Sequence, residues 1–240
     1  MQYSIIIPAK NELHNLQRTL PQFADLKGAV AYELILADGA STDGTIEFAR
    51  SKGARVEVKT KLDRETIGEG RNRGAHVATG DILVFLDAGV MVKDILNFFQ
   101  TIQAAFAHAS VVAAVPKVNI DPKEATFSDE LVHGGVNILV RFFNFMGWGA
   151  GKGECQIVRR SAFEAVGGYN EKLVAAEDND LYSRLAKKGR VVFLKELQVY
   201  DDPARYRKKG YLRVISLWLM NQIFVRLLGR SYSKEWKRAS

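Results

Sequence analysis

The stretch DILVFLDAGV, residues 81–90, is a short apolar run that leads into a carboxylate, Asp87. The stretch YELILAD, residues 32–38, has the same pattern and ends in Asp38. Continuous apolar runs of this length predict strands that are buried in a parallel sheet. Because both residues end such a strand, we expect Asp38 and Asp87 to project from one edge of one sheet. Open α/β sheets bind ligands at this edge, where the carboxyl ends of the strands lie.

Further apolar runs alternate with segments of helical periodicity. Strands are predicted at residues 3–9, 55–60, 110–118, 154–160 and 191–196, and helices at residues 70–78, 93–107, 130–146 and 177–188. Ser41 or Thr42 is expected to cap a helix that ends at Gly53. This rhythm is typical of an α/β fold with a mostly parallel central sheet and helices on both faces. The alternating strand at 55–60 is expected near an edge.

The composition is that of a folded globular protein, with 47% hydrophobic and 25% charged residues. A chain of 240 residues forms one domain by default, here residues 1–204, followed by a tail, residues 205–240. Cys155 is the single cysteine, so no intrachain disulfide forms, which fits a reducing compartment. The chain has no leader-like start and no uncharged apolar run of about eighteen residues, which predicts a cytoplasmic protein without a signal peptide or membrane span.

The net charge of +7 is concentrated in the tail. Of the 34 Lys and Arg residues, ten lie in residues 205–240, against a single acid, Glu235. They flank an apolar segment that carries Trp218 and Phe224. We expect a basic amphipathic helix on a membrane surface, where each Lys or Arg contributes about 1 kcal/mol to binding. The alternative is a helix packed on the sheet or in a homodimer interface, and nucleic acid binding is disfavoured because no stacking aromatics interleave with the basic residues.

Five segments together resemble the family 2 glycosyltransferases, which are inverting enzymes of the GT-A fold. The resemblance covers roughly residues 3–200 and rests on IIIPAKNE (5–12), ADGASTDGT (37–45), GRNRGAHVATGDILVFLDA (70–88), VRRSAFEAVGGYNE (158–171) and AEDNDLYSRLAKKG (176–189). It implies a Rossmann-like sheet with a nucleotide-sugar-binding half, residues 1–118, and an acceptor-binding half, residues 119–204.

The resemblance implies a nucleoside site around the first two strands. Its residues are Pro8, Ala9, Asn11, Glu12, Asp38 and Gly39. The Asp38 carboxylate can accept hydrogen bonds from the N–H group of a base and from ribose hydroxyls. The alternative is that Asp38 ends its strand in an Asx turn and that Asp43 caps a helix. Gly39 stands where the family more often has a second aspartate, so the base is open between a UDP and a GDP sugar.

Two arginines, Arg71 and Arg73, flank Asn72 near the predicted sheet edge. A guanidinium there can hold diphosphate oxygens in bidentate fashion, and Arg71 is our candidate. Solvated surface arginines are the alternative, above all for Arg73.

Asp87, Ala88 and Gly89 match the DxD element of the family, which positions the donor ribose and a divalent cation, Mg²⁺ or Mn²⁺. Gly89 replaces the final carboxylate, and all four histidines precede the region where the family often places a metal-binding histidine. Three alternatives stay open. Asp87 could bind the cation with phosphates and water, Asp201 or Asp202 could assist, or arginines could replace the metal.

Glu177 and Asp178 match the acidic pair of the family, whose aspartate is the catalytic base. Inversion in a single displacement needs such a base when the acceptor is a hydroxyl. Both residues open a predicted helix, whose amino terminus favours the ionised carboxylate, and simple helix capping is the alternative. If the acceptor is a phosphate anion, Asp178 orients it instead, and cations such as Arg205, Arg207 and Lys208 become useful.

These features predict an inverting glycosyltransferase that moves a sugar from a nucleotide-diphosphate sugar to a lipid-linked acceptor, such as a polyisoprenyl phosphate, or to a polysaccharide. It would lie on the inner face of the cell membrane. The competing hypothesis is a degenerate, non-catalytic nucleotide-sugar-binding scaffold. A sugar nucleotidyltransferase is disfavoured because the first strand leads into PAKNE rather than a glycine-rich phosphate loop.

Overall fold

The computed structural model describes residues 1–26, 28–60 and 63–234. The strands are β1 (Tyr3–Ala9), β2 (Tyr32–Asp38), β3 (Arg55–Val58), β4 (Ile82–Leu86), β5 (Met91–Val92), β6 (Val111–Ile120), β7 (Cys155–Arg159) and β8 (Arg190–Asp201). The helices are α1 (Leu13–Thr19), a 3-10 helix (Leu20–Leu26), α2 (Thr45–Ser51), α3 (Ile67–His76), α4 (Ile95–Phe106), α5 (Phe127–Phe145), α6 (Arg160–Ala165), α7 (Glu177–Leu185), α8 (Ala204–Lys209) and α9 (Tyr211–Leu228).

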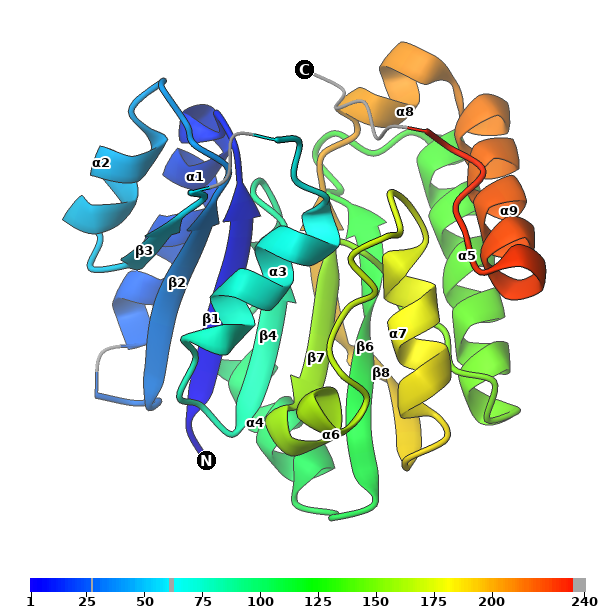
Figure 1. The fold of residues 1–240 in the computed structure, drawn as a ribbon, viewed down its shortest axis with the longest axis horizontal. Coiled ribbons are helices and arrows are strands. Elements are labelled where there is room, and N and C mark those ends of the chain that lie inside the picture. Colours follow the sequence, from blue (N-terminus) through cyan, green and yellow to red (C-terminus); the bar gives the residue numbers. More distant parts are fainter. Residues whose placement is uncertain (27, 61–62, 235–240) are drawn as a thin grey trace.

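The strands form one sheet in the order β3-β2-β1-β4-β7-β6-β8-β5 (Figure 1). Strand β1 pairs in parallel with β2 and with β4, so the ends of β2 and β4 lie at the same edge, as expected for Asp38 and Asp87. The alternating strand β3 is at the sheet edge, as predicted. The second half is mixed, because β7 runs antiparallel to both of its neighbours.

Helices cover both faces of the sheet, as the α/β pattern predicts. Ile5 and Ile7 of β1 face one core, which α1 and α4 cover, whereas Ile6 faces the other, beneath α3, α6 and α7 (Figure 1). Successive side chains of a strand point to opposite faces, so one apolar strand supplies both cores. Cys155 is buried in the first core, and burial raises the pKa of its thiol.

Several element boundaries differ from the prediction. Helix α3 begins three residues before Gly70, because Thr66 and Glu69 form a reciprocal capping box. The expectation that Ser41 or Thr42 caps α2 is wrong. The N-cap residue of α2 is Gly44, at φ 93°, and no side chain caps this helix from the N-cap position. Strand β8 runs five residues beyond Glu196, which brings Asp201 to the end of a strand.

The tail forms α8 and α9, which pack through Tyr206, Tyr211 and Val214 against Ile120 at the end of β6. Helix α9 lies beside α5 and is mostly exposed (Figure 1). Its apolar side chains are not gathered on one face. The prediction of an amphipathic helix is therefore wrong. By length and composition alone α9 could cross a membrane. The sequence analysis did not predict a span here because it required an uncharged apolar run, and Arg213 and Arg226 interrupt this one. Glu235, Lys237 and Arg238 and the Arg205 side chain lie outside the described part of the chain.

Candidate active site

A cleft of about 610 Å³ opens at the sheet edge where Asp87 follows β4. Its walls come from the start of α3, the glycine-rich turn at residues 149–154, the start of α7, and the facing sides of α5 and α9. Asp87, Glu177 and Asp178 all line this cleft. The structure therefore brings Asp87 of the predicted donor site close to the acidic pair, although Asp87 and Asp178 are 91 positions apart, whereas Asp38 is not among the residues that line the cleft.

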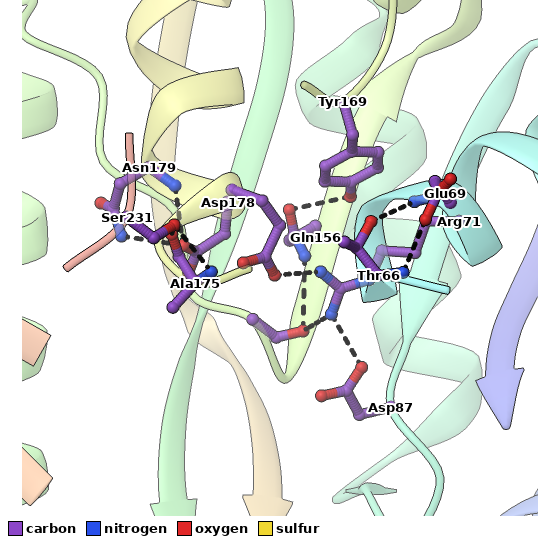
Figure 2. A network of polar contacts seen from close by, with 12 residues as sticks. Thr66, Glu69, Arg71, Asp87, Gln156, Tyr169, Ala175, Asp178, Asn179 and Ser231 are labelled. Atoms are coloured by element: carbon purple, nitrogen blue, oxygen red, sulfur yellow. Dashed lines mark hydrogen bonds and ion pairs between the residues drawn. The ribbon is translucent and has the colours of Figure 1, made fainter. Parts of the chain in front are cut away.

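Arg71 lies at the centre of this arrangement (Figure 2). Its Nη1 donates to Glu177 Oε1 at 2.8 Å, and its Nη2 donates to Asp87 Oδ1 and to the carbonyl oxygen of Gly153, both at 2.8 Å. The side chain is 1% exposed. Burial lowers the pKa of Arg71, but the charges of Asp87, Tyr169 and Glu177 outweigh it and raise the pKa above its ordinary value. In the structure the guanidinium thus links Asp87, Gly153 and Glu177, while its role toward a diphosphate stays a prediction.

A second layer of contacts holds Arg71 in place. The guanidinium stacks on the ring of Tyr169, with its central carbon 5.4 Å from the ring centroid. The Tyr169 hydroxyl donates to Gln156 Oε1 at 2.9 Å (Figure 2). Gly153 also receives a long contact, 3.4 Å, from Gln156 Nε2. These contacts fix the planar group that aligns Asp87 with Glu177.

The acidic pair opens α7, as the sequence predicted. The preceding residue, Ala176, has φ 62°, a left-handed conformation that costs free energy in a residue with a Cβ atom and recurs at functional sites. Burial raises the pKa of Glu177, although Arg71 opposes this. Burial, and then the charge of Glu177, raise the pKa of Asp178 to about 7. The expected preference for the ionised form is therefore reversed, because burial outweighs the helix terminus. A carboxylate with this pKa exchanges protons near neutral pH.

The loops that follow β1 and β2 are tied to each other by hydrogen bonds. Asp38 is fully buried, and its carboxylate accepts hydrogen bonds from both the hydroxyl and the backbone N–H of Ser41. Asn11, at φ 55°, donates its N–H to Ser41 Oγ and accepts from the N–H of Thr42. The Asp38 carboxylate thus closes a local turn onto Ser41, three residues on, which is one residue further than in the Asx turn weighed as the alternative. Gly39 donates to the Ala9 carbonyl oxygen at 2.7 Å, which ties β1 to β2 beyond their ends.

Two other expected residues hold the scaffold. Asp43 accepts from the N–H groups of Leu13 and Thr45, so it anchors the starts of α1 and α2. Arg73 donates to the carbonyl oxygens of Asp38 and Glu57 and pairs with Glu65 at 3.1 Å. The Arg73 side chain is 22% exposed and is not among the residues that line the cleft.

The residues after β4 do not form a metal cage. Gly89 has φ 94°, and a Cβ atom there would lie 3.3 Å from Cγ of Asn15 in α1. Within the described ranges, no three His, Cys, Asp or Glu residues are placed to hold a metal ion. Asp201 lines the cleft, whereas Asp202 lies 3.8 Å from Arg18 and is not among the residues that line it. The carboxylates in this part of the structure suit a cation that is held mainly by a substrate diphosphate and water.

Lys152 is a residue of the cleft that the sequence analysis missed. It is 6% exposed and lines the cleft from the glycine-rich turn. The available signal was a lysine between two glycines just before a strand, GKGEC at residues 151–155. That signal is weak in a sequence, because solvated lysines commonly occupy such turns.

Comparison with known proteins identifies the family. The model of glycosyl transferase family 2 matches residues 4–167. The chain belongs to this family. Succinoglycan biosynthesis protein ExoA of Rhizobium meliloti is 29% identical over 212 residues, which are 84% of this chain and 63% of that protein. Dolichol-phosphate mannosyltransferase of Pyrococcus furiosus is 30% identical over 90 residues, which are 37% of this chain and 26% of that protein.

The fold is shared with a solved mannosyltransferase. A mannosyltransferase of Pyrobaculum calidifontis in complex with GDP-Man and Mn²⁺ has a TM-score of 0.66 at 17% identity, covering 94% of this chain and 70% of that chain. The fold is therefore GT-A, as expected. The chain spans between a quarter and two thirds of the length of ExoA, the Pyrococcus enzyme and a validoxylamine A glucosyltransferase of Streptomyces hygroscopicus.

Proposed function

We propose that this protein is an inverting glycosyltransferase that transfers a sugar from a nucleotide-diphosphate sugar to a lipid-linked or polysaccharide acceptor. The observation that carries the proposal is the Arg71 bridge, which fixes Asp87 and Glu177 around one cleft while Asp178, the next residue, has a pKa of about 7. A carboxyl group in a cleft with a pKa near neutral pH can both accept and release a proton, as general acid–base catalysis requires. Residues 1–118 would bind the donor and residues 119–204 the acceptor.

The donor side uses the loops that follow β1, β2 and β4. Pro8, Ala9, Asn11 and Glu12 would line the nucleoside, and Asp87 with Ala88 would contact the ribose and diphosphate. Asp38 and Gly39 shape this site, since the Asp38 carboxylate is already satisfied by Ser41. Arg71 would act by positioning Asp87 and Glu177. The Pyrobaculum mannosyltransferase was solved with GDP-Man and Mn²⁺, so a cation is a reasonable companion of the donor, with Asp87 as its protein ligand.

On the acceptor side, Asp178 would accept the proton of an attacking hydroxyl. The hydroxyl oxygen forms a bond to the anomeric carbon while the bond from that carbon to the diphosphate breaks, and the nucleoside diphosphate leaves with the electron pair. Attack from the opposite face inverts the configuration. If the nucleophile is a phosphate dianion, no proton has to be removed, and Asp178 would orient it.

Membrane contact is supported by two exposed apolar helices. Leu212 and Leu227 of α9 are 88% and 77% exposed, and Phe127 and Phe145 of α5 are 79% and 86% exposed. Exposed apolar area of this kind, next to basic residues, favours binding to an anionic membrane surface. We place the protein on the inner face of the cell membrane, where cytoplasmic nucleotide sugars are available.

The decisive experiment measures transfer and donor hydrolysis with a panel of UDP and GDP sugars, with Mn²⁺, Mg²⁺ or EDTA. We expect turnover in the wild type and a loss of at least about 10² in rate for Asp178→Asn with a hydroxyl acceptor. Tight nucleotide binding without turnover of any donor would favour the non-catalytic scaffold, which the missing carboxylate at Gly89 brings into consideration.

A further inference from the structure

The cleft continues beyond the catalytic residues into an apolar groove between α5 and α9. Val136 and Val140 line one wall, and Ile215 and Trp218 line the other. The outer part is formed by residues that are themselves open to the surface, such as Leu219 at 57% exposure. The groove thus leads from the exposed apolar faces of the two helices inward to the site at the end of β4.

Lys152 stands at the inner, polar end of this groove. Its one hydrogen bond in the described chain goes to Asn137 Oδ1, at 3.5 Å, and it forms no ion pair there. An ammonium group has three N–H donors, and burying such donors without partners costs free energy. Burial lowers the pKa of Lys152 below its ordinary value, and the charges of Glu154, Asp201 and Asp178, all beyond ion-pair distance, offset this only in part. A buried cation in a cleft with donors to spare is suited to an anionic oxygen of a ligand.

The turn that carries Lys152 is rigidly built. The side-chain amide of Asn144 bonds both the N–H and the carbonyl oxygen of Ala150, at 2.7 and 2.9 Å. A Cβ atom on Gly151 would lie 2.6 Å from the ring of Tyr182, so the turn packs directly on α7. Lys152 is therefore presented at a fixed position, as a binding residue must be.

We infer that Lys152 and the groove between α5 and α9 form a subsite for an apolar chain that ends in a phosphate monoester. This inference deepens the proposed function by assigning the acceptor class and the cation that recognises it. The groove matches a chain that enters from the membrane side, and Lys152 supplies the positive charge where the chain would end. Arg207, proposed from the sequence for this role, instead donates to the Glu124 carbonyl oxygen and lies 3.6 Å from Asp129.

The test is equilibrium binding of farnesyl phosphate, farnesol and inorganic phosphate to the full chain, without nucleotide sugar. For the wild type we expect farnesyl phosphate to bind at least about tenfold more tightly than farnesol, and inorganic phosphate not to bind in the same range. Lys152→Gln should weaken farnesyl phosphate about tenfold and leave farnesol unchanged, whereas the exposed control Lys188→Gln changes neither. If Lys152→Gln is poorly folded by circular dichroism, Lys152→Met, with an unbranched apolar chain, replaces it.

A second pair of variants tests the groove. Leu219→Gln should weaken both farnesyl ligands, and Leu212→Gln, equally polar but outside the groove, should weaken neither. Equal affinity for farnesyl phosphate and farnesol, an unchanged preference in the Lys152 variants, or tight binding of inorganic phosphate alone would overturn the inference. Because no donor is present, these results stand apart from turnover: a chain that binds farnesyl phosphate as expected but turns over no donor keeps the subsite and loses the proposed transfer.

Discussion

Gly74 of α3 lies so close to Ile6 of β1 that a Cβ atom on Gly74 would be 2.5 Å from Ile6 Cγ2. This contact sets the height of α3 above the sheet and therefore the reach of Arg71, one turn earlier in the same helix. Gly74→Ala should lower the free energy of unfolding by about 1–3 kcal/mol, as overpacking does, and should also reduce turnover. Urea denaturation measures the first effect.

The matched control for that variant is Gly134→Ala in α5, where a Cβ atom has no neighbour within 4 Å. It should stabilise the protein by up to about 1 kcal/mol, because alanine is the better helix former. Equal effects of both alanines would show that the close approach of α3 and β1 is not a constraint.

Replacing Arg71 tests the bridge itself. Arg71→Met leaves Asp87 and Glu177 without their shared cation, and removing one partner of a buried pair costs about 3–5 kcal/mol. Arg18→Met removes a surface contact, 3.8 Å from Asp202, and should cost less than about 1 kcal/mol. Urea unfolding of both variants separates the two cases, and a loss for Arg71→Met as small as that for Arg18→Met would contradict the role of Arg71.

The raised pKa of Asp178 predicts a pH dependence of stability. The folded state holds this proton up to about pH 7, whereas an unfolded aspartate releases it near pH 4. The wild type should therefore lose stability as pH rises between these values. Asp178→Asn carries no such proton and should gain stability relative to the wild type as the pH rises from about 4 to about 7. Asp63→Asn, which removes an exposed carboxylate, is the control, and identical pH profiles for Asp178→Asn and the wild type would rule out the shift.

Ionisation of Asp178 should raise activity, although it lowers stability. With a hydroxyl acceptor the base must be ionised, so kcat/KM should rise with pH through about 7 and then level off. A flat profile across this range, with a donor that is turned over, would show that Asp178 does not act as the base.

Restoring the family carboxylate at Gly89 should not create a metal site. Its left-handed φ makes any side chain strained by roughly 1–3 kcal/mol, and the new Cβ would face Asn15 rather than the cleft. We expect Gly89→Asp to be destabilised and to gain no thermal stabilisation from Mn²⁺ beyond that of the wild type. Gly167→Asp, at φ 76° with open space around it, measures the backbone penalty alone. Extra stabilisation of Gly89→Asp by Mn²⁺ would refute this expectation.

Membrane binding should depend on both exposed helices. Leu227→Glu in α9 and Leu131→Glu in α5 should each reduce sedimentation with vesicles that contain phosphatidylglycerol, because both introduce charge into exposed apolar surface. Leu96→Glu in α4, at 43% exposure, serves as the control. A reduction for Leu227→Glu alone would restrict the contact to the tail.

The sequence predicts best where a pattern is local and repeated. The runs at residues 3–9 and 32–38 gave the bounds of β1 and β2, and the sheet edge that gathers Asp38 and Asp87 followed from them. Helix starts were less accurate, because the Thr66 capping box and the Gly44 turn depend on backbone geometry that the periodicity of apolar residues does not report.

The partners of the site residues could not be read from the chain. An arginine is usually a surface residue, and only the contacts of Arg71 with Asp87, Gly153 and Glu177 in the folded chain show that it is buried. For Asp178, two opposing effects act on one carboxylate, and the sequence displays the helix terminus but not the degree of burial. Lys152 was missed for the same reason, since burial in a glycine-rich turn is a property of the folded chain.

The Arg71 bridge has a consequence for how this protein could have been assembled or divided. Arg71 and Asp87 belong to residues 1–118, whereas Glu177 and Gly153 belong to residues 119–204. Strand β7 of the second part also lies directly beside β4 of the first. A fragment that ended near residue 118 would retain the Arg71 guanidinium with one of its three hydrogen-bond partners, and it would have an unpaired sheet edge. The two parts are therefore not interchangeable modules, and an exchange of residues 119–204 between relatives would have to carry the glutamate that matches Arg71.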